Sequence, residues 1–177
     1  MKIESKRFGT IEIKDDRVLT LEGGLLGFSH LKNFVLVDAQ GDPSLPFKWM
    51  ISTEDAEIGF LVADPGMFFS DYVFDLSAEE AGYLAINNPE EITVVTLLTV
   101  PTDPRMITAN LRGPLVFNNK TRRGKQIVLE SSNYATKHFI FVQEGKDETT
   151  QVSAQAADAA VAFVTDATGN MEVKTQS

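Results

Sequence analysis

Apolar and polar residues alternate along much of the chain, which is the pattern of β-strands with one buried face. In residues 8–14, for example, Ile11 and Ile13 fall on one side and polar residues on the other. Residues 92–100 form the strongest β segment, and prolines close it. Short strands are predicted at residues 8–14, 18–21, 31–38, 47–52, 59–65 and 92–100. Many short strands separated by turn residues favour a mainly β fold, either a sandwich or a small closed or nearly closed barrel.

Residues 107–129 hold two apolar, β-rich runs around a polar, basic turn, which predicts a β-hairpin with a longer loop. Gly113 and Pro114 lie inside the first run. Because proline cannot donate to a strand ladder, we expect a bend, a bulge or a sheet edge there. Asn110 has two interpretations: its amide caps a neighbouring turn, which is the commoner role of Asn, or it meets a binding partner.

One short internal helix is predicted from a capping box, in which Ser77 and Glu80 satisfy free backbone amides. The helix should run to about Ile86, where the sequence Asn-Asn-Pro ends it. Its inner face is expected to carry Ala81, Leu84 and Ala85.

The last strand is predicted at residues 139–142, and the composition changes soon afterwards. Residues 1–145 are therefore expected to form the β-domain, and residues 146–177 an Ala/Thr-rich C-terminal tail. From Glu144 onward the chain carries six acidic and two basic residues. Ser153 is placed to cap a helix over residues 154–164, but an isolated helix this short is marginal in water. The tail is thus expected to be flexible, and either ordered on a partner or simply solvated.

Four aromatic residues occur within a short stretch: Phe68, Phe69, Tyr72 and Phe74. Part of this cluster is expected to fill the core, and aromatic residues on a loop also suit a docking surface. Three glycines within residues 22–28 predict a structural turn with positive φ. They do not form a phosphate loop, because no Lys-Ser or Lys-Thr follows them.

Charge and composition narrow the functional classes. The formal net charge is −9 over 177 residues, so direct binding to nucleic acid is disfavoured. An acidic surface favours a basic partner, although the charge also serves solubility alone. There is no cysteine, no secretory signal at the N-terminus and no apolar run of the ~20 residues that span a bilayer. We therefore expect a soluble, cytoplasmic protein, monomeric by default.

The sequence carries no recognisable catalytic, metal or cofactor motif. His30 and His138 are the only histidines, without zinc-site spacing, and no nucleophile elbow is present. A pair of carboxylates, as in a glycosidase, stays open as an alternative. A basic cluster lies on the predicted hairpin turn and is interpreted as a solvated loop, or as a contact for an acidic patch or phosphate. Its members are Lys120, Arg122, Arg123 and Lys125.

Several segments, in their order along the chain, resemble the bacterial flagellar assembly factor family FliW over about residues 1–142. The most specific is Thr-Ala-Asn-Leu-x-x-Pro-x-x-x-Asn at 108–118, followed by Lys125-Gln126. The other matching segments are Phe8-Gly9 and residues 22–28, 34–36, 58–65 and 72–74. Residues 134–138 follow the closing Tyr-and-His pattern of the family only loosely, and no functional role is assigned to them.

The resemblance implies a non-enzymatic regulator with a small β-barrel-like fold. Proteins of this family bind flagellin and the RNA-binding translational repressor CsrA, whose silencing of flagellin synthesis they relieve. Flagellin termini are amphipathic helices, which dock on apolar grooves, and an RNA-binding repressor attracts acidic side chains. The expected groove residues are Phe68, Phe69 and Tyr72, with Asp71, Glu90 and Glu91 at the rim and Asn110 as a further candidate. Two alternatives stay open: a carboxylate-based hydrolase, and an export chaperone that binds flagellin only.

The composition of the tail generates the first prediction. Removing residues 146–177 should leave the thermal midpoint nearly unchanged, because a flexible tail adds no packing to the core of the β-domain. A calorimetric scan of the shortened and full chains checks this, and a large drop in the midpoint would refute it.

Overall fold

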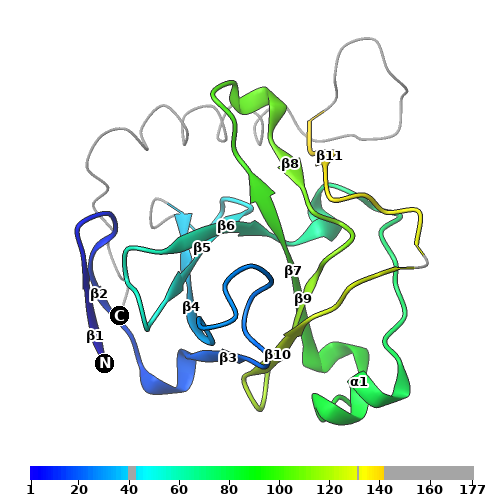
Figure 1. The fold of residues 1–177 in the computed structure, drawn as a ribbon, viewed down its shortest axis with the longest axis horizontal. Helices are drawn as coiled ribbons and strands as arrows, with labels where there is room; N and C mark the ends of the chain where they lie inside the picture. Colours follow the sequence, from blue (N-terminus) through cyan, green and yellow to red (C-terminus); the bar gives the residue numbers. More distant parts are fainter. Residues whose placement is uncertain (40–42, 131, 142–177) are drawn as a thin grey trace.

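The computed structural model describes residues 1–39, 43–130 and 132–141 (Figure 1). The predicted extension of residues 146–177, with its helix at 154–164, lies outside these described residues. The fold is mainly β, as predicted. The strands are β1 (Lys2–Ser5), β2 (Gly9–Glu12), β3 (Leu19–Leu21), β4 (Asn33–Asp38), β5 (Phe47–Ser52), β6 (Gly59–Ala63), β7 (Ile92–Thr99), β8 (Thr108–Ala109), β9 (Leu115–Asn118), β10 (Arg123–Gln126) and β11 (His138–Phe139).

Seven of these strands close into a barrel, in the order β7-β6-β5-β4-β3-β10-β9 and back to β7. Neighbouring strands are antiparallel except β3 and β10, which run parallel. The barrel closes where β9 pairs with the first half of β7, from Ile92 opposite Asn118 to Val95 opposite Leu115. The sequence prediction of a closed barrel is therefore confirmed.

Alternation along the strands places one set of side chains inside the barrel and another outside. The inner core holds Leu21, Phe34, Met50, Val62 and Phe117, each from a different strand. The residues that alternate with these on β4, β5 and β6 point outward and need a cover of their own.

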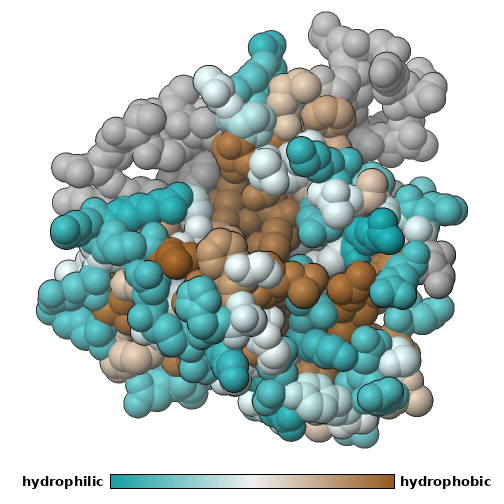
Figure 2. All heavy atoms as spheres, viewed as in Figure 1, coloured by the Kyte–Doolittle hydropathy of each residue, from teal (hydrophilic) through white to brown (hydrophobic). Residues whose placement is uncertain are grey.

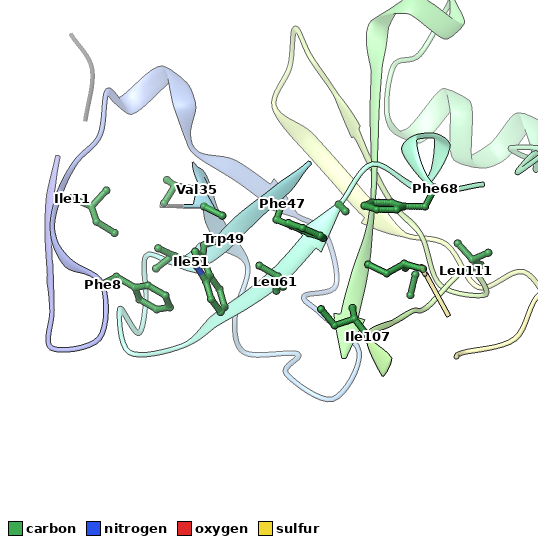
Figure 3. Close-up of a cluster of buried hydrophobic side chains, with 14 of the residues drawn as sticks. Phe8, Ile11, Val35, Phe47, Trp49, Ile51, Leu61, Phe68, Ile107 and Leu111 are labelled. Carbon is green, nitrogen blue, oxygen red and sulfur yellow. The ribbon is translucent and has the colours of Figure 1, made fainter. Parts of the chain in front are cut away.

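A second apolar cluster lies on the outer face of β4, β5 and β6 (Figure 3). On one side the β1–β2 hairpin covers it, where Phe8 lies 5.2 Å from Trp49 between ring centroids. On the other side the covering residues are Phe68, Ile107 and Leu111. The hairpin at the N-terminus is thus the lid of an outer core. The sequence analysis predicted β2 but missed β1, since only Ile3 of its four residues is buried.

Helix α1 (Ala78–Tyr83) has the predicted capping box, with both the Ser77 and the Glu80 bonds formed. It ends three residues before the predicted end, because Ala85 adopts φ +54°, outside the helical region. Leu84 is fully buried against Val116 and Ile127, whereas Ala85 is exposed. The inner-face prediction is therefore right for Leu84 and wrong for Ala85.

The predicted hairpin of residues 107–129 is present as β9 and β10, which pair with Phe117 opposite Gly124. The bend at Gly113 and Pro114 separates β9 from β8. The last strand is shorter than predicted, because β11 covers only His138–Phe139. Ile140 and Phe141 nevertheless belong to the outer core.

The wall of the closed barrel has an opening between β6 and β7. These strands pair only at Val62 with Leu97 and at Ala63 with Thr96, so their pairing ends at Leu97. On its other edge, beyond its pairing with β9, β7 pairs with β8 through Leu98 and Thr99. β8 then pairs with β11, so a small three-stranded extension leaves the barrel wall here.

Gly124 generates a stability prediction, because a Cβ at this position would lie 2.1 Å from the ring of Phe117, which is buried. Gly124→Ala should lower the free energy of unfolding by about 1–3 kcal/mol through overpacking. Gly82→Ala is the matched control. Gly82 lies in α1 with open space around it, and alanine there should be neutral or stabilising by up to ~1 kcal/mol. Urea unfolding of both variants checks this; equal stabilities would contradict the packing described.

Candidate functional site

Partner-binding residues predicted from the sequence fall into different environments. Phe68 is only 5% exposed and belongs to the outer core, where it stacks on Phe47 at 5.8 Å between centroids. Its ring is therefore part of the fold and is not available on the surface. Phe69 and Tyr72, by contrast, are half-buried and Asp71 is exposed.

Phe69 and Tyr72 lie in an aromatic cluster with Tyr134 and His138. The Tyr72 and Tyr134 rings are 4.7 Å apart, and His138 lies 6.0 Å from Phe69, all between centroids. The Tyr72 hydroxyl donates to the carbonyl oxygen of Leu111 at 2.8 Å, and burial raises the pKa of Tyr72. The cluster thus fixes the loop after η3 (Pro65–Met67) against the end of the described chain.

The sequence analysis assigned no role to Tyr134 and His138. In the structure both side chains form hydrogen bonds to backbone groups. The Tyr134 hydroxyl accepts from the Val73 amide and donates to the Val73 carbonyl, both at 3.0 Å. His138 Nε2 accepts the Ala135 amide at 2.7 Å, which requires a ring nitrogen without a proton. The His138 bond is local, but the bonds between Tyr134 and Val73 span 61 residues, so no local sequence signal could reveal the cluster.

The predicted rim charges do not surround the aromatic cluster. Glu91 precedes Ile92 at the start of β7, whereas the cluster packs near Leu98 at its end. Six residues of strand, roughly 20 Å, separate the two positions. A hydrogen bond from Lys120 lowers the pKa of Glu91 to about 2. Glu90 is exposed beside it. That Glu90 and Glu91 bind a partner remains a prediction. These two residues lie on a different surface from Asp71.

Asn110 has the turn-capping role that the sequence favoured. Its side-chain oxygen accepts the Gly113 amide at 3.1 Å, which stabilises the turn before Pro114. The backbone N–H of Asn110 donates to the backbone carbonyl oxygen of Leu97 at 2.9 Å.

The basic cluster on the hairpin turn is paired within the domain. Three of its four cations face a carboxylate: Lys120 with Glu91, Arg123 with Glu22, and Lys125 with Glu80. Arg123 also lies over the Tyr83 ring at 4.8 Å. These pairs are partly exposed and contribute little stability individually, but they occupy much of the cluster with acids of the same chain.

An apolar strip that the sequence analysis missed lies at the opening between β6 and β7. We define it as Phe28, Leu36, Phe60, Leu97 and Phe139. Leu36, Phe60 and Leu97 pack against the inner core, and Phe28 meets Phe60 edge-to-face at 5.1 Å. Figure 2 shows apolar side chains gathered in a band down the middle of this face, hollowed at its centre.

Strand register places Phe139 on the same face as Leu97. Thr99 of β7 lies opposite Thr108 of β8, and Thr108 lies opposite Phe139 of β11. Paired residues share one side of a sheet, as do residues two apart on a strand. The strip therefore runs from β4, which carries Leu36, across β5, β6, β7 and β8 to β11.

The glycine turn predicted from the sequence holds Phe28 in the strip. Gly24 has φ +72°, and a Cβ there would meet the Ser29 carbonyl at 2.4 Å. The next residue, Leu25, is buried in the inner core, and the Phe28 amide donates to its carbonyl at 2.7 Å. The predicted structural role of these glycines is confirmed.

The described residues contain no group of three or more His, Cys, Asp or Glu side chains placed to hold a metal ion. Within the same part of the chain, no helix is long and apolar enough to span a membrane.

Comparison with known proteins gives consistent matches. A sequence model described as FliW protein matches residues 2–140. The flagellar assembly factor FliW of Geobacter sulfurreducens is 40% identical over 148 residues, which cover 84% of this chain and 91% of that protein. The Natranaerobius thermophilus protein of the same name is 39% identical over 82% of this chain and 95% of its own length. A crystal structure of the flagellar assembly factor FliW superposes with a TM-score of 0.75 at 33% identity, covering 81% of this chain and 99% of that one.

His138 generates a pH prediction. Burial lowers its pKa in the folded state below the usual value of about 6.5. His138 therefore binds a proton more readily in the unfolded chain than in the folded one. The contribution of neutral His138 to stability is therefore complete above pH ~6.5 and is lost as the pH falls below it.

Between pH ~7.5 and ~5.5, the wild type should lose more unfolding free energy than His138→Gln, which cannot titrate. His30→Gln is the control, since His30 is exposed. Urea titrations at both pH values check this, and a His138→Gln variant with the pH dependence of the wild type would contradict it.

Proposed function

The chain belongs to the FliW family, and from this premise we propose that it is a non-catalytic cytoplasmic regulator of flagellar assembly. In this proposal it binds flagellin and a CsrA-type translational repressor, and it relieves the silencing of flagellin synthesis. The family match over nearly the whole described domain is the observation that carries the proposal. The two partners differ in chemistry, so each is expected to use a different part of the surface.

Flagellin is proposed to dock at the apolar strip. An amphipathic helix lays its apolar face into a hydrophobic groove, and the strip gathers five partly exposed apolar side chains on one face of the sheet. The aromatic cluster suits this role less well, because the Tyr72 and Tyr134 hydroxyls are bonded within the domain and the rings pack on one another. Phe69 and Tyr72 are therefore proposed to support the neighbouring surface and to contact a partner only at their edges.

The repressor is proposed to approach the acidic surface. An RNA-binding protein carries basic side chains, and complementary charge raises the association rate more than the affinity of the final complex. Asp71 is exposed beside the aromatic cluster, and Glu90 is exposed at the far end of β7. Glu91 is already paired with Lys120, so it contributes less free charge.

Sizing of mixtures tests the function as a whole. The chain is mixed with purified repressor and with flagellin separately, and each complex is sized by chromatography with light scattering. Stable complexes with both partners support the proposal. A complex with flagellin alone would instead favour an export chaperone. The absence of both complexes, together with turnover of a sugar or other small molecule, would favour the carboxylate-based hydrolase.

The strip yields a prediction for flagellin. Phe28→Ala removes an exposed aromatic ring from the strip and should weaken flagellin binding roughly tenfold, equivalent to about 1.4 kcal/mol. Tyr83→Ala is the control, because Tyr83 is a similarly exposed ring on α1. Calorimetric titration measures both affinities. Unchanged affinity in a folded Phe28→Ala variant would remove the strip from the flagellin interface.

Asp71 yields a separate prediction for the repressor. Asp71→Lys should slow association with the repressor several-fold, and the effect should shrink at high salt because the charge is exposed. Asp16→Lys makes the same charge change in η1 (Asp15–Arg17) and should have a smaller effect. Stopped-flow or surface-binding kinetics at two salt concentrations check this. Equal association rates for the two variants would show that the repressor responds only to the net charge of the protein and not to the position of Asp71.

A further inference from the structure

We propose that residues 152–164 of this chain dock on the apolar strip as an amphipathic helix. The docking follows from the geometry of the strip and the sequence of the segment. Its consequence, that the segment competes with the flagellin helix for the strip, rests on the proposed function.

The strip leaves large apolar side chains uncovered. Phe139 is 45% exposed and Phe28 36% exposed, and Leu36, Phe60 and Leu97 are only partly buried. The strip lies where the pairing of β6 with β7 ends at Leu97, and β8 and β11 continue the same face of the sheet from the other edge of β7. An exposed apolar patch of this kind marks a surface that binds another apolar surface.

The place where the described chain ends favours a segment of the same chain as the occupant. Phe141 is the last described residue and follows the strip residue Phe139 by two positions. From β11 to β4, which carries Leu36, the strip crosses five strand spacings, roughly 24 Å. Residues 142–151 reach up to about 33 Å when extended, and a 13-residue helix is about 20 Å long. The linker and the helix together are therefore long enough to reach across the strip from its own edge.

The segment has the composition that such a docking needs. Its only charged residue is Asp158, which on a helix lies on the side of Gln155. The opposite side is apolar and is formed by Ala156, Ala157, Ala160, Val161, Phe163 and Val164. Because an isolated helix of this length is marginal in water, the strip would stabilise the helix and the helix would cover the strip.

Two further observations favour this occupant over a second molecule. The segment lies beyond the family match, which ends at residue 140, and the matched part makes up nearly the whole length of the relatives. A tethered segment also acts at an effective concentration on the order of mM, which a free partner must exceed through affinity. The tail thus supplies an internal competitor that lies beyond the family match of residues 2–140.

The test uses the full chain, which has no cysteine. Gln151→Cys, which leaves the Ser153 cap in place, therefore gives one position for a nitroxide spin label, whose paramagnetism broadens NMR signals of nearby nuclei. We expect broadening concentrated on the methyl groups of Leu36 and Leu97 and on the Phe139 amide. Methyl groups of Val116 and Ile127, which pack under α1, serve as reference signals.

Two matched double variants decide whether the apolar side of the segment is responsible. Val161→Asp with Val164→Asp adds two charges on that side and should abolish the broadening at the strip. Gln155→Asp with Ala162→Asp adds the same charge on the polar side and should preserve it. Uniform broadening, or equal broadening in the two variants, would overturn the proposal.

A mixture separates docking within one molecule from docking between two. Spin-labelled chain without isotope enrichment is mixed with enriched, unlabelled chain. Absence of broadening in this mixture supports docking within the chain, whereas broadening at the strip would assign the site to a second copy and overturn the proposal.

The competition is measured separately by titrating flagellin into the two double variants. Val161→Asp with Val164→Asp should bind flagellin several-fold more tightly than the matched variant. Equal affinities with the broadening pattern intact would contradict only the use of the strip by flagellin, and the docking of the segment would stand.

Discussion

Strand β7 makes the pairings on which the rest of the structure depends. Its first half pairs with β9 and closes the barrel, its middle pairs with β6, and its end pairs with β8. β9 and β8 follow one another along one edge of β7, whereas β6 lies on the opposite edge and pairs only at Thr96 and Leu97. The same strand therefore closes the barrel at one end and opens it at the other. The opening uncovers the apolar strip.

The outer side of the barrel explains which aromatic residues are structural. Strands β4, β5 and β6 carry apolar side chains on both faces, as buried strands do. Their outer face must be covered, and Phe8, Phe68 and Ile107 do this from three separate segments. Phe69 and Tyr72 then complete a border of this cover, fixed by hydrogen bonds from Tyr72 and Tyr134 to the backbone. A partner therefore has to bind on a side of the molecule that these covering segments leave exposed.

The sequence predicts local features well because their causes are local. The alternation at residues 47–52 locates β5, and the Ser77–Glu80 capping box locates the start of α1. The glycines at residues 23, 24 and 27 indicate a turn with positive φ, and all three have positive φ in the structure. The family resemblance, carried by residues 108–118, is confirmed by the match over residues 2–140.

The site was predicted less well, because it depends on strand pairing between distant residues. Phe68 and Phe69 are adjacent in sequence, yet only the turn at η3 decides that Phe68 enters the core. Phe28, Phe60 and Phe139 come together only through the register of four strands and one loop, and no pattern along the chain marks that register. Glu91 is acidic in the sequence, but its charge is paired with Lys120 in the fold.

Amide hydrogen exchange of the complex with flagellin tests most directly whether the opening made by β7 is the binding surface. The account predicts slower exchange on complex formation at residues 26–28, 58–61 and 97–99, with little change in α1 and the β9–β10 turn. Protection confined to α1 and that turn, with the strip unchanged, would contradict it.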